Sequence, residues 1–223
     1  DQPLILYFMK KLLFSALLLV ACLVQTQAQD TRHVIRFSPF GVVNKVRLQY
    51  EYALTDNVSA GAIGSYYYAL FPGIKLEPFA RYYLTNTPAP EGLYLQAKAV
   101  GGRFSSRLGY VAVTEHYNEA GEFSHFSASA DDIIKKRQFT TGGAGIAIGY
   151  QALLGKENRV SIDFNLGAQY VHYPKEIRKF REEAIVDGKR QVTTYTPDFA
   201  DKVWTYTGPG AYFNPMLSFG YSF

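Results

Sequence analysis

The strongest constraint on this chain is a strict two-residue alternation of apolar and polar side chains. The segment 160–170 divides into an apolar set and a polar set: Val160, Ile162, Phe164, Leu166, Ala168 and Tyr170 against Ser161, Asp163, Asn165, Gly167 and Gln169. A period of two places the two sets on opposite faces of a β-strand. The segments 46–54 and 217–223 alternate in the same way, so an all-β fold is predicted.

Eight segments have the composition of strands: 33–43, 46–54, 58–69, 75–85, 93–104, 138–153, 159–172 and 209–223. Most of them have the length that a tilted strand needs to cross a bilayer. Three compact turns rich in Asp, Asn, Gly and Pro, at 55–57, 85–92 and 155–158, fall on one side if the strands run antiparallel in order. The two long links, 105–137 and 174–208, then fall on the other side. This asymmetry predicts an eight-stranded antiparallel up-and-down transmembrane β-barrel with two long extracellular loops.

The first residues of the chain indicate export. Met9 and two lysines precede an apolar run at 12–24, and a polar stretch then ends in Ala28, as in a secretory signal. The run is shorter than a spanning helix requires. We expect cleavage before Gln29, with lipoprotein processing at Cys22 as the alternative. Residues 1–28 are then upstream residues and signal peptide, and 29–223 form a single barrel domain.

Composition excludes several classes of function. Without Asp1, Lys10 and Lys11, the 23 basic and 19 acidic residues fall to 21 and 18, and no basic cluster is interleaved with aromatic residues. A nucleic-acid partner is therefore not expected. The single cysteine, Cys22, lies in the signal, so the exported part has no disulfide and no thiolate zinc site. The histidines lack metal-ligand spacing such as HExxH, and neither a metal nor a cofactor is expected.

Alternation alone also fits a packed β-sandwich, but aromatic residues at the strand ends favour a membrane barrel. One set is expected at the outer interface: Tyr66, Tyr67, Tyr68, Tyr170 and Tyr173. A second set is expected at the inner interface: Tyr52, Tyr82, Tyr150, Tyr221 and Phe223. The location predicted from these features is the bacterial outer membrane.

Two stretches, "RFSPFGVVNKVRLQYEYALTDNVSAGAIGSYYY" and "PFARYYLTNTPAPEGLYLQAKA", resemble a small outer-membrane β-barrel family of Bacteroidota. The resemblance covers roughly 36–100 and the carboxyl end, and it is lost in 105–137 and 174–208. That family has no defined biochemical activity, so the resemblance implies location and architecture but no catalytic residues. OmpX- and OmpW-like barrels are similar in architecture only. The resemblance also implies that Phe219, Tyr221 and Phe223 form a signal read by the barrel-assembly machinery.

The alternation collects charged side chains on the face that would line the lumen: Arg36, Arg47, Glu51, Glu77, Arg81, Lys98 and Asp163. The interior of an eight-stranded barrel is only wide enough for its side chains. Enclosed charges must then be paired, which favours a structural network of ion pairs. The alternative is a narrow water-filled conduit that these residues gate.

The two long links contain the remaining candidate sites. His116, Ser124, His125, Ser127 and Asp131 could form a hydrolase or acyltransferase centre, but no motif such as GxSxG frames them, so no catalytic residue is assigned. In 174–208, Arg178 with Glu182 and Lys179 with Glu183 favour one or two helical turns. Asp187-Gly188 predicts a type I′ turn.

The sequence thus predicts a non-enzymatic outer-membrane barrel with an envelope-structural or surface-interaction role through its outer loops. The expected partners are membrane lipid, lipopolysaccharide, the barrel-assembly machinery and an unidentified surface ligand. A narrow channel for small solutes or ions is the first alternative. A lipid A-modifying enzyme that uses the loop His and Ser residues is the second.

Overall fold

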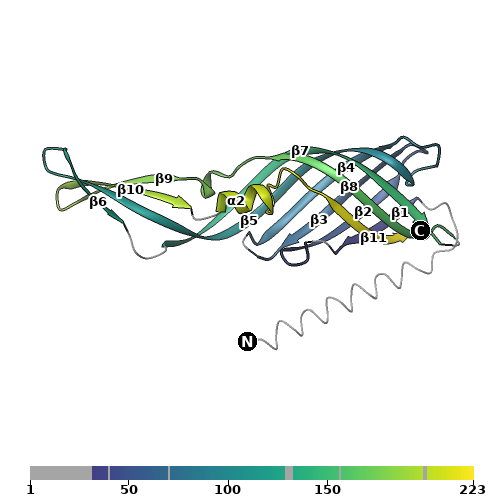
Figure 1. The fold of residues 1–223 in the computed structure, drawn as a ribbon, viewed down its shortest axis with the longest axis horizontal. Helices are drawn as coiled ribbons and strands as arrows, with labels where there is room; N and C mark the ends of the chain where they lie inside the picture. The colour runs from purple at the N-terminus through teal and green to yellow at the C-terminus, as the bar shows by residue number, and fades with distance from the viewer. Residues whose placement is uncertain (1–31, 40, 70, 129–132, 156, 198–199) are drawn as a thin grey trace, which may run out of the picture.

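The computed structural model describes residues 32–223 except 40, 70, 129–132, 156 and 198–199 (Figure 1). The predicted signal peptide, with its two candidate processing sites at Cys22 and Gln29, lies outside the described residues, as does Asp131.

Eight strands close into an antiparallel barrel: β1 (His33–Ser38), β2 (Lys45–Ala53), β3 (Val58–Tyr67), β4 (Gly73–Tyr83), β5 (Gly92–Tyr117), β7 (Ile133–Leu154), β8 (Val160–Val171) and β11 (Met216–Ser222). Their order around the barrel is β4-β3-β2-β1-β11-β8-β7-β5, and pairing of β4 with β5 closes it. Each strand pairs with its neighbours along the chain, apart from the segments inserted before β11. The predicted all-β, eight-stranded up-and-down barrel is confirmed.

Compact turns join the strands at one end, called here the turn end. In the first of them, Thr55 Oγ1 accepts hydrogen bonds from the backbone N–H groups of Asn57 and Val58 at 3.3 and 3.1 Å. A side chain that bonds to the backbone in this way stabilises a tight reversal. His33 and Phe223 meet at the same end, where His33 N donates to Phe223 O at 3.0 Å. The opposite end of the barrel is called the extension end.

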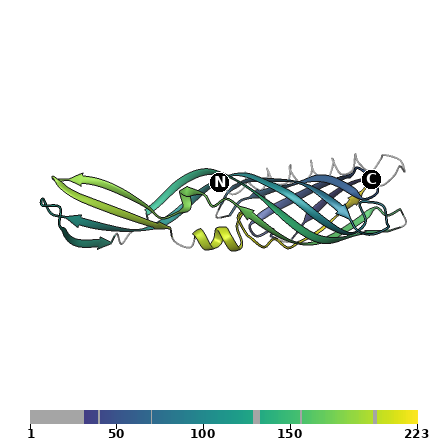
Figure 2. The ribbon, with the colours of Figure 1, turned by 90° about the horizontal axis from the view of Figure 1, so that it is seen from above.

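The expected long loops are largely β-sheet. β5 and β7 run past the barrel, where β5 pairs with β6 (Phe123–Ala128) on one edge and with β10 (Lys189–Pro197) on the other. β10 in turn pairs with β9 (Phe180–Val186). The resulting sheet, called the extension, projects from the barrel along the longest axis of the molecule (Figures 1 and 2). The two strands predicted to end at 104 and to begin at 138 therefore continue to Tyr117 and begin at Ile133.

The second long link corrects one prediction and confirms another. The expected helical turns at 175–184 are wrong, because only a 3₁₀ turn, η1 (Lys175–Ile177), precedes β9. Pairs four residues apart in a helix contribute only about 0.2–0.5 kcal/mol each, less than the ladder that β9 forms with β10. The turn at 187–188 is confirmed, since Asp187 and Gly188 have φ of 51° and 75° between the paired residues Val186 and Lys189. Positive φ at both positions defines a type I′ turn.

A short helix, α2 (Ala200–Tyr206), lies where the extension meets the barrel (Figure 1). Its Trp204 is buried, with ring centroids 5.4 Å from Phe71, 5.8 Å from Phe104 and 5.5 Å from Phe139. With Tyr67 these residues form the aromatic cap of the barrel. Residues 209–215, predicted as part of the last strand, instead lead from α2 to β11, with a single bridge between Phe213 and Ala168.

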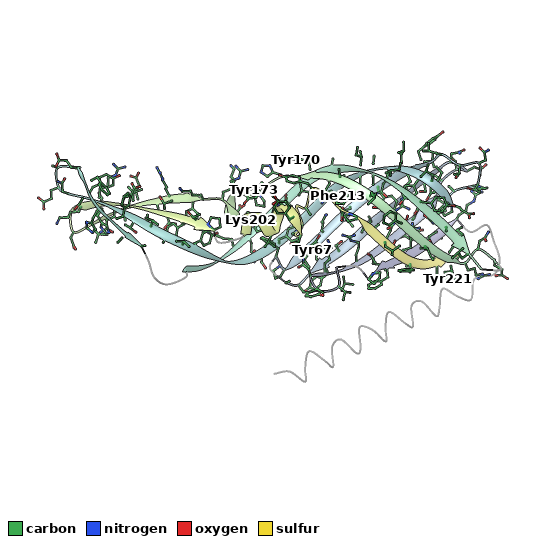
Figure 3. The ribbon with its side chains drawn as sticks, viewed as in Figure 1. Tyr67, Tyr170, Tyr173, Lys202, Phe213 and Tyr221 are labelled. Atoms are coloured by element: carbon green, nitrogen blue, oxygen red, sulfur yellow. The ribbon has the colours of Figure 1, made fainter. Side chains whose placement is uncertain are left out.

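The outward face of the barrel is apolar, and the exposed side chains include Leu48, Tyr50, Ile74, Leu95, Ile146, Phe164 and Leu166. Exposed tyrosines occur at both ends of the barrel, such as Tyr170 at the extension end and Tyr82 at the turn end. Figure 3 shows Tyr170 and the half-buried Tyr221 at opposite ends. Tyr67, predicted to lie in the outer aromatic row with Tyr66 and Tyr68, instead points inward and is 1% exposed. Successive side chains of an extended segment point to opposite faces, so Tyr67 points inward where Tyr66 and Tyr68 point outward. Across the described residues, every helix is too short or too polar to cross a lipid bilayer.

Candidate functional site

The inward side chains of β4 give the order of layers inside the barrel. From the extension end to the turn end they are Lys75, Glu77, Phe79, Arg81 and Tyr83, all buried. They alternate with exposed residues because β4 is extended without interruption over this stretch. Phe79 contacts Ile63 and Met216 in an apolar layer. This layer separates one group of charges around Arg81 from a second group around Glu77.

The first group, called the balanced cluster, consists of Arg36, Glu51, Arg81 and Asp163, whose side chains are fully buried. Arg81 donates to Glu51 Oε2 at 2.8 Å and to Asp163 Oδ2 at 2.9 Å. Arg36 forms an ion pair with Glu51, and its Nε lies 3.8 Å from Asp163 Oδ2. Two positive and two negative charges therefore compensate one another in a space closed to solvent.

Neutral side chains add hydrogen bonds to the balanced cluster, in which Arg36 Nε is the guanidinium atom without a hydrogen-bond partner among the described residues. Tyr83 Oη donates to Glu51 Oε1 at 2.7 Å, and Tyr94 Oη donates to Asp163 Oδ1 at 2.6 Å. The guanidinium of Arg81 also lies 4.0 Å from the centroid of the Tyr94 ring. Tyr94 fits because it faces a glycine on β7: a Cβ at Gly149 would lie 2.4 Å from Tyr94 Oη. A network satisfied to this extent holds its members in one geometry.

The second group, called the basic cluster, consists of Lys45, Arg47, Lys75 and Lys98 around Glu77. Lys98 Nζ lies 2.6 Å from Glu77 Oε1, and Lys75 Nζ lies 3.3 Å from Glu77 Oε2. Arg47 donates to Asn214 Oδ1 at 3.3 Å, and Lys45 donates to the Tyr67 hydroxyl at 3.3 Å. In the described part of the chain, this cluster holds four basic side chains and one carboxylate.

The structure divides the seven predicted lumen charges between the two clusters. Arg36, Glu51, Arg81 and Asp163 meet in the balanced cluster, and Arg47, Glu77 and Lys98 meet in the basic cluster. Sequence reasoning missed Lys75 and Lys45, which share the inward face of their strands with Glu77 and Arg47. The alternation signals both, because each precedes its neighbour by two residues. The seven predicted residues are four basic and three acidic side chains, and the two additional lysines turn this near balance into an excess of basic groups.

Side chains close both ends of the lumen. At the turn end, Tyr83 and Tyr94 pack with Ala53 and Ala89. At the extension end, the aromatic cap covers the basic cluster. From one end to the other, the lumen is occupied by a tyrosine layer, the balanced cluster, an apolar layer, the basic cluster and the aromatic cap.

The described surface of the barrel includes two hollows that bear on the site. The larger, about 650 Å³, is on the outer face of β4, β5, β7 and β8, and its walls are mostly apolar, including Leu95, Ile148 and Leu166. The smaller, about 340 Å³, lies at the extension end and is lined by Gly41, Val43, Asn44, Lys45, Ala69, Val203 and Thr207. We call this second hollow the mouth cavity. Of the residues that line it, Lys45 is the charged one.

The candidate catalytic residues of the first long link lie on the extension. His116 Nε2 and Ser127 Oγ are hydrogen-bonded at 2.8 Å, and the rings of His116 and His125 stack with centroids 4.5 Å apart. Ser124 Oγ is 3.2 Å from His125 Nδ1. A serine bonded to a histidine is one part of an activated nucleophile. However, β6 is exposed along its length, and the predicted acid, Asp131, lies outside the described residues. Among the described residues, no group of side chains has the composition of a metal site.

Charged and aromatic side chains also meet across the extension. Arg190 donates to Glu183 at 2.9 Å, and its guanidinium lies 5.3 Å from the ring centroid of Tyr117. Tyr117 Oη donates to Glu115 at 2.9 Å, and this hydrogen bond raises the pKa of Tyr117 above its ordinary value. The hydrogen bond to Glu183 likewise raises the pKa of Arg190. These contacts join β5, β9 and β10 on a surface open to solvent.

The predicted assembly residues follow the outward face of β11 and the residue after it. Phe219 is exposed, and the Tyr221 hydroxyl accepts a hydrogen bond from Arg159 at 2.7 Å. Phe223 stacks on His33 with ring centroids 5.4 Å apart. Their role in assembly stays a prediction.

Comparison with known proteins assigns the chain to a family. No curated protein and no solved structure matches it significantly. A family model described as a protein of unknown function, DUF3575, matches residues 13–197. The match covers most of the chain, from before β1 to the end of β10. The chain therefore belongs to the DUF3575 family of proteins of unknown function.

Proposed function

We propose that this protein is an integral outer-membrane β-barrel without enzymatic activity, which anchors the extension and presents it as an interaction surface outside the membrane. The observation that carries the proposal is the distribution of side chains across the barrel wall. The outward face exposes large apolar residues, with Leu48 57% and Ile146 69% exposed, while charged residues are enclosed in the lumen. A soluble protein seldom exposes a continuous apolar surface, whereas a membrane barrel requires one.

The aromatic residues at the two ends support the same placement. Tyr66, Tyr68 and Tyr170 are exposed at the extension end, and Tyr82 and Tyr150 are exposed at the turn end. Tyrosines favour the interface between hydrocarbon and water, where the ring is buried and the hydroxyl is hydrated. Lipid and lipopolysaccharide are then the partners of the apolar belt. The compact turns face the periplasm, and the extension faces outward.

The filled lumen favours an anchor over a conduit. Ion pairs, the apolar layer of Ile63, Phe79 and Met216 and the aromatic cap occupy the interior in succession. Conduction through an eight-stranded barrel requires these side chains to move apart. We therefore expect purified protein in planar bilayers to show no discrete conductance steps. Steps that change with Glu77→Gln would instead establish the channel function.

The extension supplies the interaction surface. β6 and β9 are at its two edges, and Phe123, Phe126 and Ile185 are 50%, 62% and 79% exposed. Unpaired strand edges and exposed aromatic side chains are features that binding partners use. The surface ligand is expected to contact this part of the molecule.

One experiment tests location and orientation together. An epitope tag inserted between Asp187 and Gly188, in the turn of the β9–β10 hairpin, should react with antibody on intact cells. The same tag at 86–87, in a turn-end loop, should react only after the outer membrane is permeabilised. The purified chain should also need detergent and migrate faster on gels before heating. A chain that stays soluble without detergent, or equal labelling of both tags on intact cells, contradicts the proposal.

A further inference from the structure

The two charge clusters of the lumen differ in their balance. The balanced cluster pairs two arginines with two carboxylates, while the described residues of the basic cluster include four cations and one carboxylate, Glu77. Taking an ion out of water costs several kcal/mol unless a counter-charge accompanies it. A buried excess of positive charge therefore requires either an anion or the loss of protons.

Among the described residues, Lys45 and Arg47 are the members of the basic cluster that form no ion pair. Lys75 and Lys98 both bind Glu77. Within the described part of the chain, Lys45 and Arg47 have only neutral acceptors, the hydroxyl of Tyr67 and the amide oxygen of Asn214. Arg47 is 3% exposed, and its buried Nε has no hydrogen-bond partner among the described residues. The two side chains thus have donor capacity that no carboxylate of the described residues uses.

The mouth cavity reaches the first of these two residues, Lys45. Lys45 forms part of its wall, beside Asn44 and opposite Val203 and Thr207 around α2. Arg47 lies two residues further along the same inward face of β2. Tyr67, which binds the ammonium of Lys45, lies at the end of the barrel next to α2 (Figure 3). An anion in the cavity would contact Lys45 directly, and Arg47 is the next inward residue of the same strand.

The surrounding charges favour a ligand with more than one negative charge. Arg47, Lys75 and Lys98 are near enough to repel the ammonium of Lys45, and Glu77 only partly offsets them. A low-dielectric wall around a cavity of one sign concentrates this field. Arginine forms paired hydrogen bonds with phosphate oxygens, and lysine adds a mobile point charge. A phosphate group matches both the charge and the donors.

We propose that Lys45 and Arg47 bind a phosphate group, carried by inorganic phosphate, a phosphate monoester or a lipid head group, which reaches them through the mouth cavity beside α2. This site goes beyond the anchoring function and does not depend on what the extension binds. Lys75 and Lys98 add to the positive potential at the site without binding the phosphate group themselves. Both form ion pairs with Glu77.

Trp204 allows the site to be tested directly. It is the single tryptophan of the chain, and its neighbour Val203 lines the mouth cavity. The full chain, folded in detergent, is titrated with inorganic phosphate at constant ionic strength against chloride. We expect a saturable change in tryptophan fluorescence and a rise in the unfolding temperature. Lys45→Gln and Arg47→Gln should each weaken the apparent affinity by about tenfold or more, the loss expected for one charge-assisted hydrogen bond.

The matched control is Arg103→Gln, which removes the same charge from an exposed side chain on β5. It should leave the phosphate response unchanged, and Lys45→Arg should retain most of it. Absence of a saturable response of the parent chain to inorganic phosphate excludes a soluble ligand and leaves the lipid head group to the second arm below. Equal weakening by Lys45→Gln and Arg103→Gln overturns the proposal. A response equal to that produced by chloride overturns it as well.

The source of the phosphate group is identified in a separate arm without free phosphate. Mixed micelles that contain phosphatidic acid are compared with micelles of phosphatidylcholine alone. A Lys45-dependent response to phosphatidic acid, with none to inorganic phosphate, assigns the site to a lipid head group. A response to inorganic phosphate assigns it to a soluble ligand. Absence of a Lys45-dependent response in both arms rejects the site, whether or not the tagged chain reaches the outer membrane.

Discussion

The guanidinium of Arg81 on β4 lies 2.9 Å from the carboxylate of Asp163 on β8, although β5 and β7 separate these strands in the barrel wall. Arg81 reaches Asp163 because the lumen is narrow and because Gly149 leaves room for Tyr94 between them. The pair therefore joins non-adjacent strands, which backbone hydrogen bonds cannot do.

Asp163→Asn tests this connection. The substitution keeps the shape of the side chain but leaves Arg81 and Arg36 with less compensating charge. We expect the free energy of unfolding to fall by about 3–5 kcal/mol, the range for a broken buried ion pair. Denaturant unfolding in lipid vesicles measures the change. Ser161→Ala, on the same face of β8, should cost about 1 kcal/mol. Equal losses for the two variants would contradict the assigned role of Asp163.

Phe164→Arg and Asn165→Arg test which face of β8 meets lipid. Phe164 is exposed on the outer face, and Asn165 is buried in the lumen. In vesicles, arginine at Phe164 should cost about 2–4 kcal/mol if the residue lies near the bilayer midplane. Transfer into detergent should reduce that cost. Arginine at Asn165 should destabilise the barrel equally in both media, because it crowds the lumen and adds a positive charge. A cost for Phe164→Arg that is the same in both media would argue against burial in lipid.

Gly210→Ala tests the aromatic cap. A Cβ at residue 210 would lie 2.0 Å from Trp204 Nε1, so the indole must move. We expect a red shift of tryptophan emission and a loss of about 1–3 kcal/mol, as for other overpacked sites. Gly101→Ala is the control, because a Cβ there meets no atom within 4 Å. Unchanged emission from Gly210→Ala would show that Trp204 is not packed in the aromatic cap.

Ser127→Ala and His116→Ala test the enzymatic alternative. Their hydrogen bond of 2.8 Å lies on an exposed part of the extension. We expect lipid A to have the same mass spectrum in cells that express either variant and in cells that express the parent chain. Cells that lack the gene should give the same spectrum as well. A modification that appears with the parent chain and disappears with Ser127→Ala would establish a lipid A-modifying activity.

The barrel could be predicted from the sequence because its signal is local. Alternation along β8 or β4 reports which face each residue occupies, and compact turns such as 55–57 report how neighbouring strands connect. The inward positions of Glu51, Glu77 and Asp163 follow from the same period. The second predicted strand begins at residue 46, one residue later than β2 begins, and Lys45 is therefore omitted from the predicted inward face.

The extension and the cap could not be predicted in the same way, because they depend on pairing between distant segments. β10 reaches β5 through the register Thr193–Thr114, and no local pattern specifies that partner. The charges of 178–183 suit a helix as well as a strand, and the ladder with β10 decides between them. Trp204 likewise finds Phe71 and Phe104 only once the barrel has closed.

The continuity of β5 fixes the reach of the molecule. Its 26 residues, at about 3.3 Å each, span roughly 85 Å, nearly three times the hydrocarbon thickness of about 30 Å. The same strand forms part of the barrel wall and part of the extension, so along β5 no linker separates the barrel from the extension. The distance of the extension's tip from the barrel is then set by a residue count. Two residues added opposite each other in β5 and its paired strand would lengthen the extension by one two-residue repeat and keep each side chain on the same face of the sheet.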